Sequence, residues 1–509
     1  MKYILFSLFA FVKLSVLAQA PLDMSYGTNG ISLLTNFPSN HCVDASLQTD
    51  GKLLNFYFNT VGGFQHGFFI FRSNTNGSLD TTFAANTGIP NAIKGVNYIQ
   101  VSGCGDGGVI RQCKDGKIIL ADWGSSITKY NADGTTDQSY GTNGWASLNL
   151  SSSTPQILYI RDFYEDASFN HYYMSFSINR DTLLLAKTFA NGQMDNSYGI
   201  SGVKAISLAG SALGNYPYIL TGIFKKNGHV LLGGQNGNSQ AFVLEMDLNG
   251  NLQTSFGNNG YYLDNITNSK RYTNITEYQN GDLFVGASNY TFGSEEFYMQ
   301  KMSASGVIDN TFGTQGKYTF PYPSSPNNVP YIHTPSYVYN GTPLYVSSFY
   351  YTGAGSNQAL HQNYYSLLTS GIPNNQFGNS GTWNTPINFR IEKMLCQADG
   401  KILAVGSDSV NPRIIRYASN QTTASEVYNK TMNAMYQIGH SIFFSTQKNS
   451  KLHAKLFSVT GNLIATYQES DFNSLNSEHV VQLPQSLVKG IYLFQLYNNG
   501  MPETMKVFY

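Results

Sequence analysis

A nine-residue motif that recurs seven times is the feature of this 509-residue chain that most restricts its fold. Each copy reads as an aliphatic or small residue, a second residue that is usually Asp, any residue, Ser or Thr, an aromatic residue and Gly-x-x-Gly, as in Leu22–Gly30. The aromatic position holds Tyr26, Phe83, Tyr140, Tyr198, Phe256, Phe312 and Phe377, at intervals of 57, 57, 58, 58, 56 and 65 residues. A period of this length indicates a modular array in which each unit packs mainly against its neighbours.

Each interval shows the same order of short strands. An alternating apolar run is followed by a two-residue turn, a second apolar run and a third strand, and the next motif opens a fourth strand, as in Trp145–Leu150. Asn-Gly and Asp-Gly turns supply the positive φ angles of tight hairpins, and only the third unit has Asn170-His171 in this place. The turns are Asp50-Gly51, Asp115-Gly116, Asn227-Gly228, Asn280-Gly281, Asn340-Gly341 and Asp399-Gly400. Four strands in about 57 residues is the size of one blade, so residues 19–417 predict a seven-bladed β-propeller.

The residues of the motif are predicted to be structural. Its Asp can accept backbone N–H groups in the following turn, and its aromatic ring can fill the space between neighbouring sheets. Its glycines allow a backbone path that is closed to residues with a Cβ atom. We therefore expect the seven aromatic side chains to pack inside the protein rather than to bind a ligand.

The ends of the array predict how it closes. The chain opens with a motif and the strand Ile31–Thr35, whereas the last unit has its third strand near Arg413–Tyr417 and no motif after it. We expect the N-terminal strand to pair with this third strand, because closure from both ends leaves no open sheet edge.

The array resembles a known family through two segments, Gln112–Leu120 and Gln397–Gly406, taken with the Asp-x-Ser-aromatic-Gly motif. They look like the delta-60 repeats of bacterial secreted proteins, a class of β-propeller. The resemblance covers roughly residues 22–418. It implies a fold but no activity, because the family is defined by its repeat.

The N-terminus predicts export. Lys2 precedes an apolar run over Tyr3–Val12, and Val16-Leu17-Ala18 supplies small or aliphatic residues before a cleavage site at Gln19. Residues 1–18 are therefore predicted to be a signal peptide. No later run approaches the length of a membrane span, so no transmembrane span is expected.

Composition restricts the partners. Charged residues are 12% of the chain and the formal net charge is zero, so no basic surface is expected to neutralise nucleic-acid phosphates. None of the four cysteines has a metal-ligand spacing. Cys104 could pair with Cys113, and Cys42 with Cys396, in an oxidising compartment, or all four thiols could be free.

The tail has a different pattern. Residues 418–426 are polar and predict a linker, and residues 427–509 alternate as five to seven short strands, which favours a small C-terminal β-sandwich. The tail resembles the type A C-terminal sorting domain of the type IX secretion system of Bacteroidetes-type bacteria. It departs from that family at Val427–Lys430, which stands where Pro-Asn-Pro is usual, and a generic immunoglobulin-like module is the alternative. The resemblance rests on segments around Gly461, Gly490, Tyr492 and Lys506, and it implies the secretion machinery as partner and a secreted or cell-surface location.

The sequence contains no recognised catalytic or cofactor-binding motif. The chain lacks a nucleophile elbow, a zinc-protease motif, a P-loop and a dinucleotide fingerprint, so no catalytic residue, metal or cofactor is predicted. Its nine histidines share no position in the repeat. Turns such as Asn131–Gly134 and Asp247–Gly250 resemble half of a calcium loop but lack the closing glutamate, and Asx-Gly turns explain them without metal.

The long sixth unit offers a candidate ligand platform. Tyr331, Tyr350, Tyr351 and Tyr364 could stack on sugar rings if they are exposed, or pack against one another if they are not. The overall expectation is an exported binding or scaffold protein with an extracellular glycan or protein ligand. The alternative is a secreted hydrolase or lyase acting on glycans in a central funnel, because catalytic residues from separate blades would escape a sequence scan.

Overall fold

The computed structural model divides into two compact units between Gln421 and Thr422. It describes residues 22–34, 41–61, 65–84, 93–101, 107–122, 125–148, 157–264, 270–278, 280–289, 296–320, 344–352, 359–374, 381–384, 389–408, 411–417, 436–438, 441–444, 452–459, 461–475, 478–488, 490–498 and 501–508. The predicted signal peptide (1–18) and linker (418–426) lie outside these ranges.

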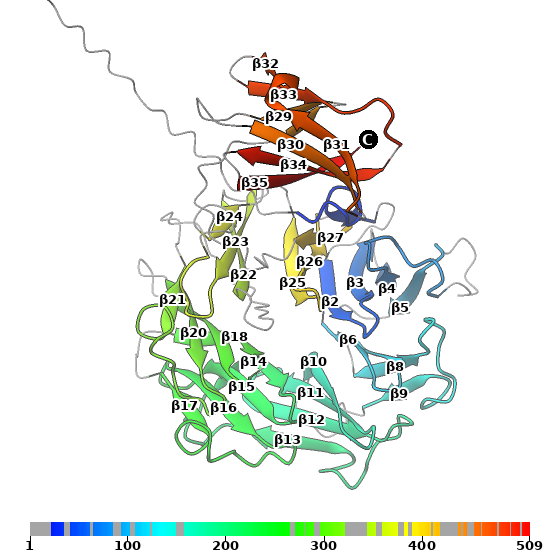
Figure 1. Ribbon diagram of the computed structural model, residues 1–509. Coiled ribbons are helices and arrows are strands. Elements are labelled where there is room, and N and C mark those ends of the chain that lie inside the picture. The colour runs from blue at the N-terminus through cyan, green and yellow to red at the C-terminus, as the bar shows by residue number, and fades with distance from the viewer. Residues whose placement is uncertain are drawn as a thin grey trace, which may run out of the picture. The chain divides into compact units, whose positions relative to one another are not determined.

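The described strands of the first unit form seven antiparallel sheets, six with four strands and one with three (Figure 1). Sheets 1 to 3 contain β2 (His41–Leu47), β3 (Leu53–Val61), β4 (Gln65–Ser73) and β5 (Val96–Val101); β6 (Val109–Gln112), β7 (Ile118–Ala121), β8 (Ser126–Tyr130) and β9 (Trp145–Ser147); and β10 (Ile157–Glu165), β11 (His171–Ser177), β12 (Thr182–Thr188) and β13 (Val203–Ser207). Sheets 4 to 6 contain β14 (Tyr218–Phe224), β15 (Val230–Gln235), β16 (Ala241–Met246) and β17 (Tyr261–Leu263); β18 (Lys270–Glu277), β19 (Leu283–Asn289), β20 (Glu296–Met302) and β21 (Lys317–Thr319); and β22 (Leu344–Thr352), β23 (Ala359–Leu367) and β24 (Thr382–Asn384). Sheet 7 contains β25 (Arg390–Cys396), β26 (Ile402–Ser407), β27 (Pro412–Tyr417) and β1 (Ile31–Leu33).

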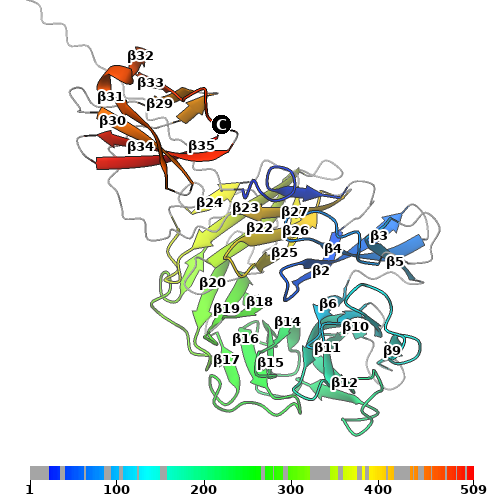
Figure 2. The same cartoon turned by 45° about the vertical axis from the view of Figure 1, so that its right-hand side comes forward.

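The sheets surround a common centre, with their first strands innermost (Figures 1 and 2). Strand β2 lies beside both β6 and β25, β10 lies beside β6 and β14, and β14 lies beside β18. Sheets 1 to 6 then run outward in chain order, whereas sheet 7 runs from β25 to β27 and ends with β1; in every sheet the last strand follows a repeat motif. This radial arrangement is that of a β-propeller.

The N-terminal strand completes sheet 7. Ile31 pairs with Ile415, and Leu33 pairs with Arg413, in an antiparallel register. The prediction that the two ends of the array meet in one sheet is therefore confirmed.

The exceptional turn of the third unit lies a few residues before the predicted Asn170-His171. The Asp166 N–H donates to the carbonyl of Asn170, and Phe169 adopts a positive φ of 62°. His171 is already the first residue of β11. The Asp166 carboxylate makes this turn without glycine, because it accepts the N–H groups of Ser168 and Asn170.

A backbone hydrogen bond links each of five motifs to a turn of the following sheet. The N–H group next to the motif aromatic donates, and the acceptor is a carbonyl in the turn that follows the third strand of the next sheet. The bonds, each 2.7 Å long, run from Gly27 to Asn76, Ala84 to Asp133, Gly141 to Asn191, Gly257 to Ser305 and Gly313 to Ser370. We call this contact the inter-sheet joint.

The motif aromatic closes each joint. Tyr26, Phe83, Tyr140, Tyr198, Phe256 and Phe312 are buried, whereas Phe377 lies outside the described residues. Five of the rings lie against a glycine of the next turn, so closely that a Cβ atom on Gly306 would come within 2.6 Å of Phe256. The glycines of these turns, which follow Asn, Asp or Ser, are thus platforms for the rings, and Asp133 uses its Oδ1 to accept the N–H and hydroxyl of Thr135 in the same turn.

In sheets 1, 3, 5 and 7 the motif Asp is held by a cation from the third strand of its own sheet, whereas in sheet 2 Lys117, just before the second strand, binds Asp137 at 2.7 Å. Arg72 binds Asp80 at 2.8 Å, Lys187 binds Asp195 at 2.8 Å, and equivalent pairs occur in other sheets. The additional pairs are Lys301 with Asp309 and Arg416 with Asp23. The same cations lie over motif rings, as with the guanidinium carbon of Arg416, 4.4 Å from the centroid of Tyr26.

Two sheets replace both members of this pair. In sheet 4, Glu245 and Gln253 occupy the positions of cation and Asp, and the Glu245 carboxylate binds Lys225 at 3.0 Å. In sheet 6, the Asn374 amide donates to the Ser366 hydroxyl at 3.3 Å. Both substitutions avoid an unpaired buried charge, which is costly.

The second unit contains eight strands in its described residues, arranged as two four-stranded antiparallel sheets with a short 3₁₀ helix, η2 (Glu469–Asp471). The sheets are, in hydrogen-bonded order, β28 (Tyr436–Ile438), β29 (Ser441–Phe444), β33 (Glu478–Gln482) and β32 (Asn473–Leu475); and β31 (Leu463–Gln468), β30 (Leu452–Ser458), β34 (Ile491–Asn498) and β35 (Met501–Phe508). One core joins both, with Phe444 and Val481 from the first and Phe494 from the second. The expectation of five to seven strands was too low, partly because Pro502 disguises β35, an edge strand in which proline is tolerated.

Among the described residues, no helix combines the length and the apolar character needed to cross a membrane.

Replacing Gly306 by Ala tests the joint. The change places a Cβ at a φ of +75° and drives it into the Phe256 ring, so we expect the strain of a positive φ plus an overpacking cost of about 1–3 kcal/mol. The matched control is Gly116→Ala, because Gly116 has a similar φ of +80° but no atom within 4 Å of the added Cβ. Equal shifts of the urea midpoint in both variants would contradict the role of the glycine as a ring platform.

Acid should weaken the Asp–cation pairs. The hydrogen bond from Lys301, with help from Thr311, lowers the pKa of Asp309 from 3.8 to about 2. A carboxylate whose pKa is lower in the folded state contributes stability above its unfolded pKa and loses it as the pH falls. We therefore expect the melting temperature to drop more steeply between pH 3.8 and about 2 in the native chain than in Asp309→Asn, measured by circular dichroism. Parallel pH profiles would refute this contribution.

Candidate functional site

The tyrosines proposed as a ligand platform lie in the sixth unit. Tyr331 lies outside the described residues. Tyr350 and Tyr351 belong to β22, and Tyr364 belongs to β23, where its backbone pairs with Ser347. The structure describes these three only as backbone, so their role stays a prediction.

A different pair of tyrosines is exposed at the start of β14. Tyr216 is 83% exposed and Tyr218 is 42% exposed, whereas Pro217 between them is buried. Successive residues of an extended segment point to opposite sides and alternate residues to the same side, so both rings project from the side opposite to Pro217. Large exposed aromatic side chains on a folded surface often mark a binding site.

The loop before these tyrosines is anchored to the core. Leu213 is fully buried, and its carbonyl accepts the N–H of Gly237 at 3.1 Å. Gly210 donates to the carbonyl of Gly214 at 3.0 Å, which closes a turn in the loop. The tyrosines are therefore presented by an ordered segment, which limits the entropy lost on binding.

Arg180 stands beside the second tyrosine. It lies in the turn between β11 and β12, and its carbonyl accepts the N–H of Ile219 at 2.6 Å. Its guanidinium carbon lies 5.4 Å from the centroid of the Tyr218 ring. We call Tyr216, Tyr218 and Arg180 the tyrosine platform.

The platform combines flat apolar faces with hydrogen-bond donors. A tyrosine ring offers a π-face and a hydroxyl, and a guanidinium offers several N–H groups in one plane. Asn215 and Asn238, both exposed, add amide groups on the adjoining loops. Sequence reasoning overlooked Tyr216-Pro217-Tyr218, although two aromatic residues flanking a proline at a strand start were a visible signal.

Charged side chains of the first strands form a connected network at the centre of the unit. The buried Asp44 carboxylate of β2 binds Lys393 of β25 at 2.7 Å and also the guanidinium of Arg111. Arg111 in turn lies 3.5 Å from Asp162 of β10, which accepts the N–H of Phe224 from the next sheet. These groups link the inner strands of five sheets.

Two carboxyl groups of the inner strands titrate abnormally. Burial opposes ionisation of Asp44, but Arg111 and Lys393 outweigh it and lower the pKa of Asp44. Burial raises the pKa of Glu392 to about 8, against the opposing charge of Arg390. The first carboxylate serves as the hub of the charge network, whereas the second can carry a proton at neutral pH.

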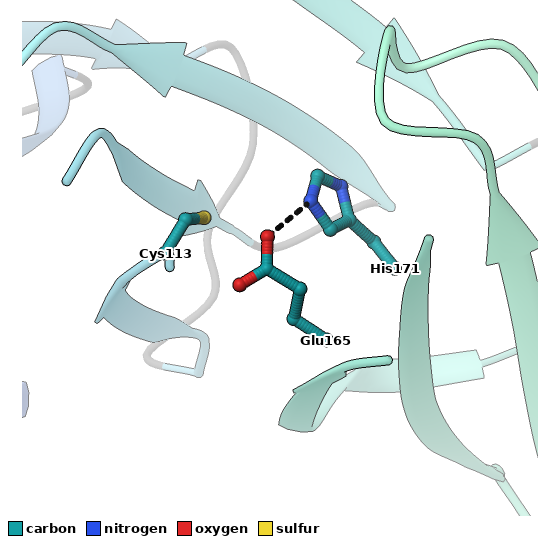
Figure 3. Close-up of side chains that lie close together, drawn as sticks. All are labelled: Cys113, Glu165 and His171. Carbon is teal, nitrogen blue, oxygen red and sulfur yellow. Dashed lines mark ion pairs between the residues drawn. The ribbon is translucent and has the colours of Figure 1, made fainter. Parts of the chain in front are cut away.

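A third group of side chains meets between sheets 2 and 3 (Figure 3). Cys113 follows β6, Glu165 ends β10 and His171 begins β11; all are buried, and their ligand atoms lie within 4.8 Å of one another. Glu165 Oε1 is 3.4 Å from His171 Nε2. Sequence reasoning missed the group because Cys113 comes from a different repeat than Glu165 and His171, although the aberrant third-unit turn pointed to His171.

The cysteine thiols settle one open alternative. Cys42, Cys113 and Cys396 are free, so the Cys42–Cys396 disulfide is not formed, and Cys104 lies outside the described residues. Burial raises the pKa of the Cys113 thiol above its usual 9.0, so this sulfur is protonated at neutral pH unless a cation binds it.

The residues of the sorting resemblance occupy defined places in the second unit. Gly461 has a φ of +85° in the turn between β30 and β31. Gly490 directly precedes β34, and the nearby Tyr492 is buried and donates its hydroxyl to the carbonyl of Val488 at 2.6 Å. Lys506 lies in β35 opposite Leu493.

Comparison with known proteins bears on the fold. A family model described as "Domain of unknown function (DUF5122) beta-propeller" matches residues 397–420, which include β26 and β27. The chain contains a β-propeller. No curated protein sequence matches it.

The propeller is also similar to solved structures at low identity. These include the core factor of S. cerevisiae, at 8% identity and a TM-score of 0.41, over 79% of this chain and 64% of that one. An extracellular domain of a hybrid two component system from B. thetaiotaomicron has 10% identity and a TM-score of 0.26, over 92% and 69%. An endo-arabinase from Bacteroides thetaiotaomicron has 12% identity and a TM-score of 0.26, over 52% and 94%. The chain thus spans less than two thirds of the yeast chain.

Proposed function

We propose that this protein is an exported seven-bladed β-propeller that binds a glycan through the tyrosine platform and is delivered by its C-terminal domain. The observation that carries the proposal is the exposure of Tyr216 and Tyr218 on an anchored loop beside Arg180. The sugar ring would place its C–H groups on the tyrosine faces, and its hydroxyl groups would accept hydrogen bonds from the guanidinium.

The blade number rests on the repeat. Seven motifs, seven sheets in the described part of the first unit and a shared sheet for β1 and β27 support a ring of seven blades closed by both ends. The resemblance of the repeats to delta-60 propellers supports the same reading. A closed ring leaves no sheet edge for aggregation, which suits a protein outside the cell.

A binding role is favoured by the way charges are used. Asp44, Arg111, Asp162 and Lys393 satisfy one another across the inner strands, and the motif carboxylates hold joints. Groups engaged in this way are poorly suited to exchange protons with a substrate, whereas the platform is exposed and its rings are free to contact a ligand. Glu392, with its raised pKa, is the residue on which the alternative of a glycan hydrolase or lyase would rest.

The binding of the purified protein, with both units present, to a glycan array tests whether the tyrosine platform binds a glycan. Replacing both Tyr216 and Tyr218 by Ala should weaken binding to the recognised glycan about tenfold or more, because exposed tyrosines dominate contact energies. The control is Trp145→Ala, which removes another exposed ring, 47% accessible, from the outer strand β9.

Three other results would each overturn the proposal. Unchanged affinity in the double variant would place the ligand elsewhere. Binding to a protein and to no glycan would change the ligand class. Cleavage of the bound glycan, abolished by Glu392→Gln and not by the tyrosine changes, would establish the enzyme.

A reporter fusion tests whether the C-terminal domain directs export. Residues 425–509, joined to a reporter with a signal peptide in a bacterium that has the type IX machinery, should send the reporter to the cell surface or medium. Replacing Tyr492 by Ala, which removes its packing and its bond to Val488, should reduce export. A reporter that stays in the periplasm while the full chain is exported would show that the signal lies elsewhere.

A further inference from the structure

His171 is buried, and the contact of its ring with Glu165, at 3.4 Å between Nε2 and Oε1, is an ion pair rather than a hydrogen bond. His171 is 0% exposed, and neither of its ring nitrogens makes a hydrogen bond; Glu165 Oε1, next to it, makes none either. Leaving a buried polar group unsatisfied costs about 1–3 kcal/mol, and such groups in a native fold call for an explanation such as a missing ion.

The repeat itself does not require these residue types. The position of His171, which pairs with the residue ten before the motif aromatic, holds Leu53 in sheet 1 and Ile118 in sheet 2, both buried and apolar. The position of Cys113 holds Gln48 in sheet 1. Histidine thus replaces an apolar repeat residue, and cysteine replaces a glutamine, where the two face each other between sheets 2 and 3.

We infer that Cys113, Glu165 and His171 bind a divalent transition-metal ion of the zinc type at the joint between sheets 2 and 3 (Figure 3). Thiolate, imidazole and carboxylate are the donors that zinc selects in proteins. Tetrahedral nitrogen and oxygen ligands at about 2.1 Å from zinc lie about 3.4 Å apart, and Glu165 Oε1 and His171 Nε2 are 3.4 Å apart.

The carboxylate is already oriented for this role. Glu165 Oε2 accepts the backbone N–H of Lys114 at 2.6 Å, which leaves Oε1 for the ion. The same hydrogen bond, from a backbone N–H of the preceding sheet to a glutamate carboxylate, occurs in sheet 5, where Glu277 accepts the N–H of Lys226 at 2.8 Å and no Cys–Glu–His group is found among the described residues. This hydrogen bond therefore explains why residue 165 is a glutamate, but it does not explain why residues 113 and 171 are cysteine and histidine.

The charges balance in a buried setting. A doubly charged cation, a thiolate, a carboxylate and a neutral imidazole sum to zero, and the proton of the Cys113 thiol leaves to solvent when the metal–sulfur bond forms. The nearby ammonium of Lys129 is neutralised by Asp115 at 2.9 Å, so it does not repel the ion. A water molecule would complete the tetrahedron. Because the cluster is buried and joins two sheets, the ion would be structural, and its binding is independent of the glycan platform.

Metal analysis of the intact chain tests the inference. The purified protein should retain one equivalent of zinc after dialysis, and cobalt should replace it with a thiolate-to-cobalt charge-transfer band in the near ultraviolet. In a chain carrying Cys42→Ala, Cys104→Ala and Cys396→Ala, only Cys113 can give this band, so its absence from the folded protein would overturn the site.

Single changes assign the ligands. Cys113→Ala and His171→Gln should weaken zinc affinity at least tenfold, and Glu165→Gln should do so while keeping the acceptor for the Lys114 N–H. The matched controls are Cys42→Ala and His229→Gln, since His229 pairs with Glu245 at 2.6 Å and belongs to no Cys–Glu–His group of the described residues. Equal affinities in ligand variants and controls would show that Glu165 and His171 form only an ion pair. If a ligand variant fails to fold, the cobalt spectrum of the chain that keeps only Cys113 decides whether the site binds a metal ion.

Discussion

The inter-sheet joint is the contact on which the rest of the first unit depends. One residue set supplies it: a backbone N–H for the next turn, a ring that covers the glycine of that turn, and a carboxylate that holds a cation over the ring. Each sheet is thereby fixed to the next by contacts between neighbours in sequence, as in other repeat proteins. The sheets can then vary in their loops without losing their mutual placement.

The division into sheets was predictable from the sequence because the motif and its turns recur at a regular interval. The period, the Asx-Gly hairpins and the missing last strand predict the sheets and the pairing of β1 with β27, since each follows from local backbone chemistry. The contact between a motif ring and a glycine was not predictable from the sequence. It joins Phe256 to Gly306 in the next unit, and the period of the repeat does not show which turn a ring contacts. The compensating change at Glu245 and Gln253 was not predictable either, because the sequence does not show that Lys225 supplies the cation for Glu245.

The candidate sites were less predictable for a physical reason. Function in a repeat array resides where a unit departs from its own pattern, and such departures have no period to detect. The sequence shows Tyr216 and Tyr218 on either side of a proline but not their exposure or the anchoring of their loop by Leu213, and Cys113 meets His171 only after two sheets are placed side by side. The sequence marks the deviation, and the fold shows whether deviations meet.

The shared sheet of β1 and β27 also sets an order of events. During synthesis the first strand is made long before its partner, so the edge of β27 that receives it, and β1 itself, stay unpaired until the whole first unit has left the ribosome. Loop closure over so long a segment is slow compared with the hairpins inside each sheet. The first unit therefore passes through an open arc of sheets before β1 pairs with β27, and a chaperone that binds the nascent chain would meet that arc rather than the folded unit.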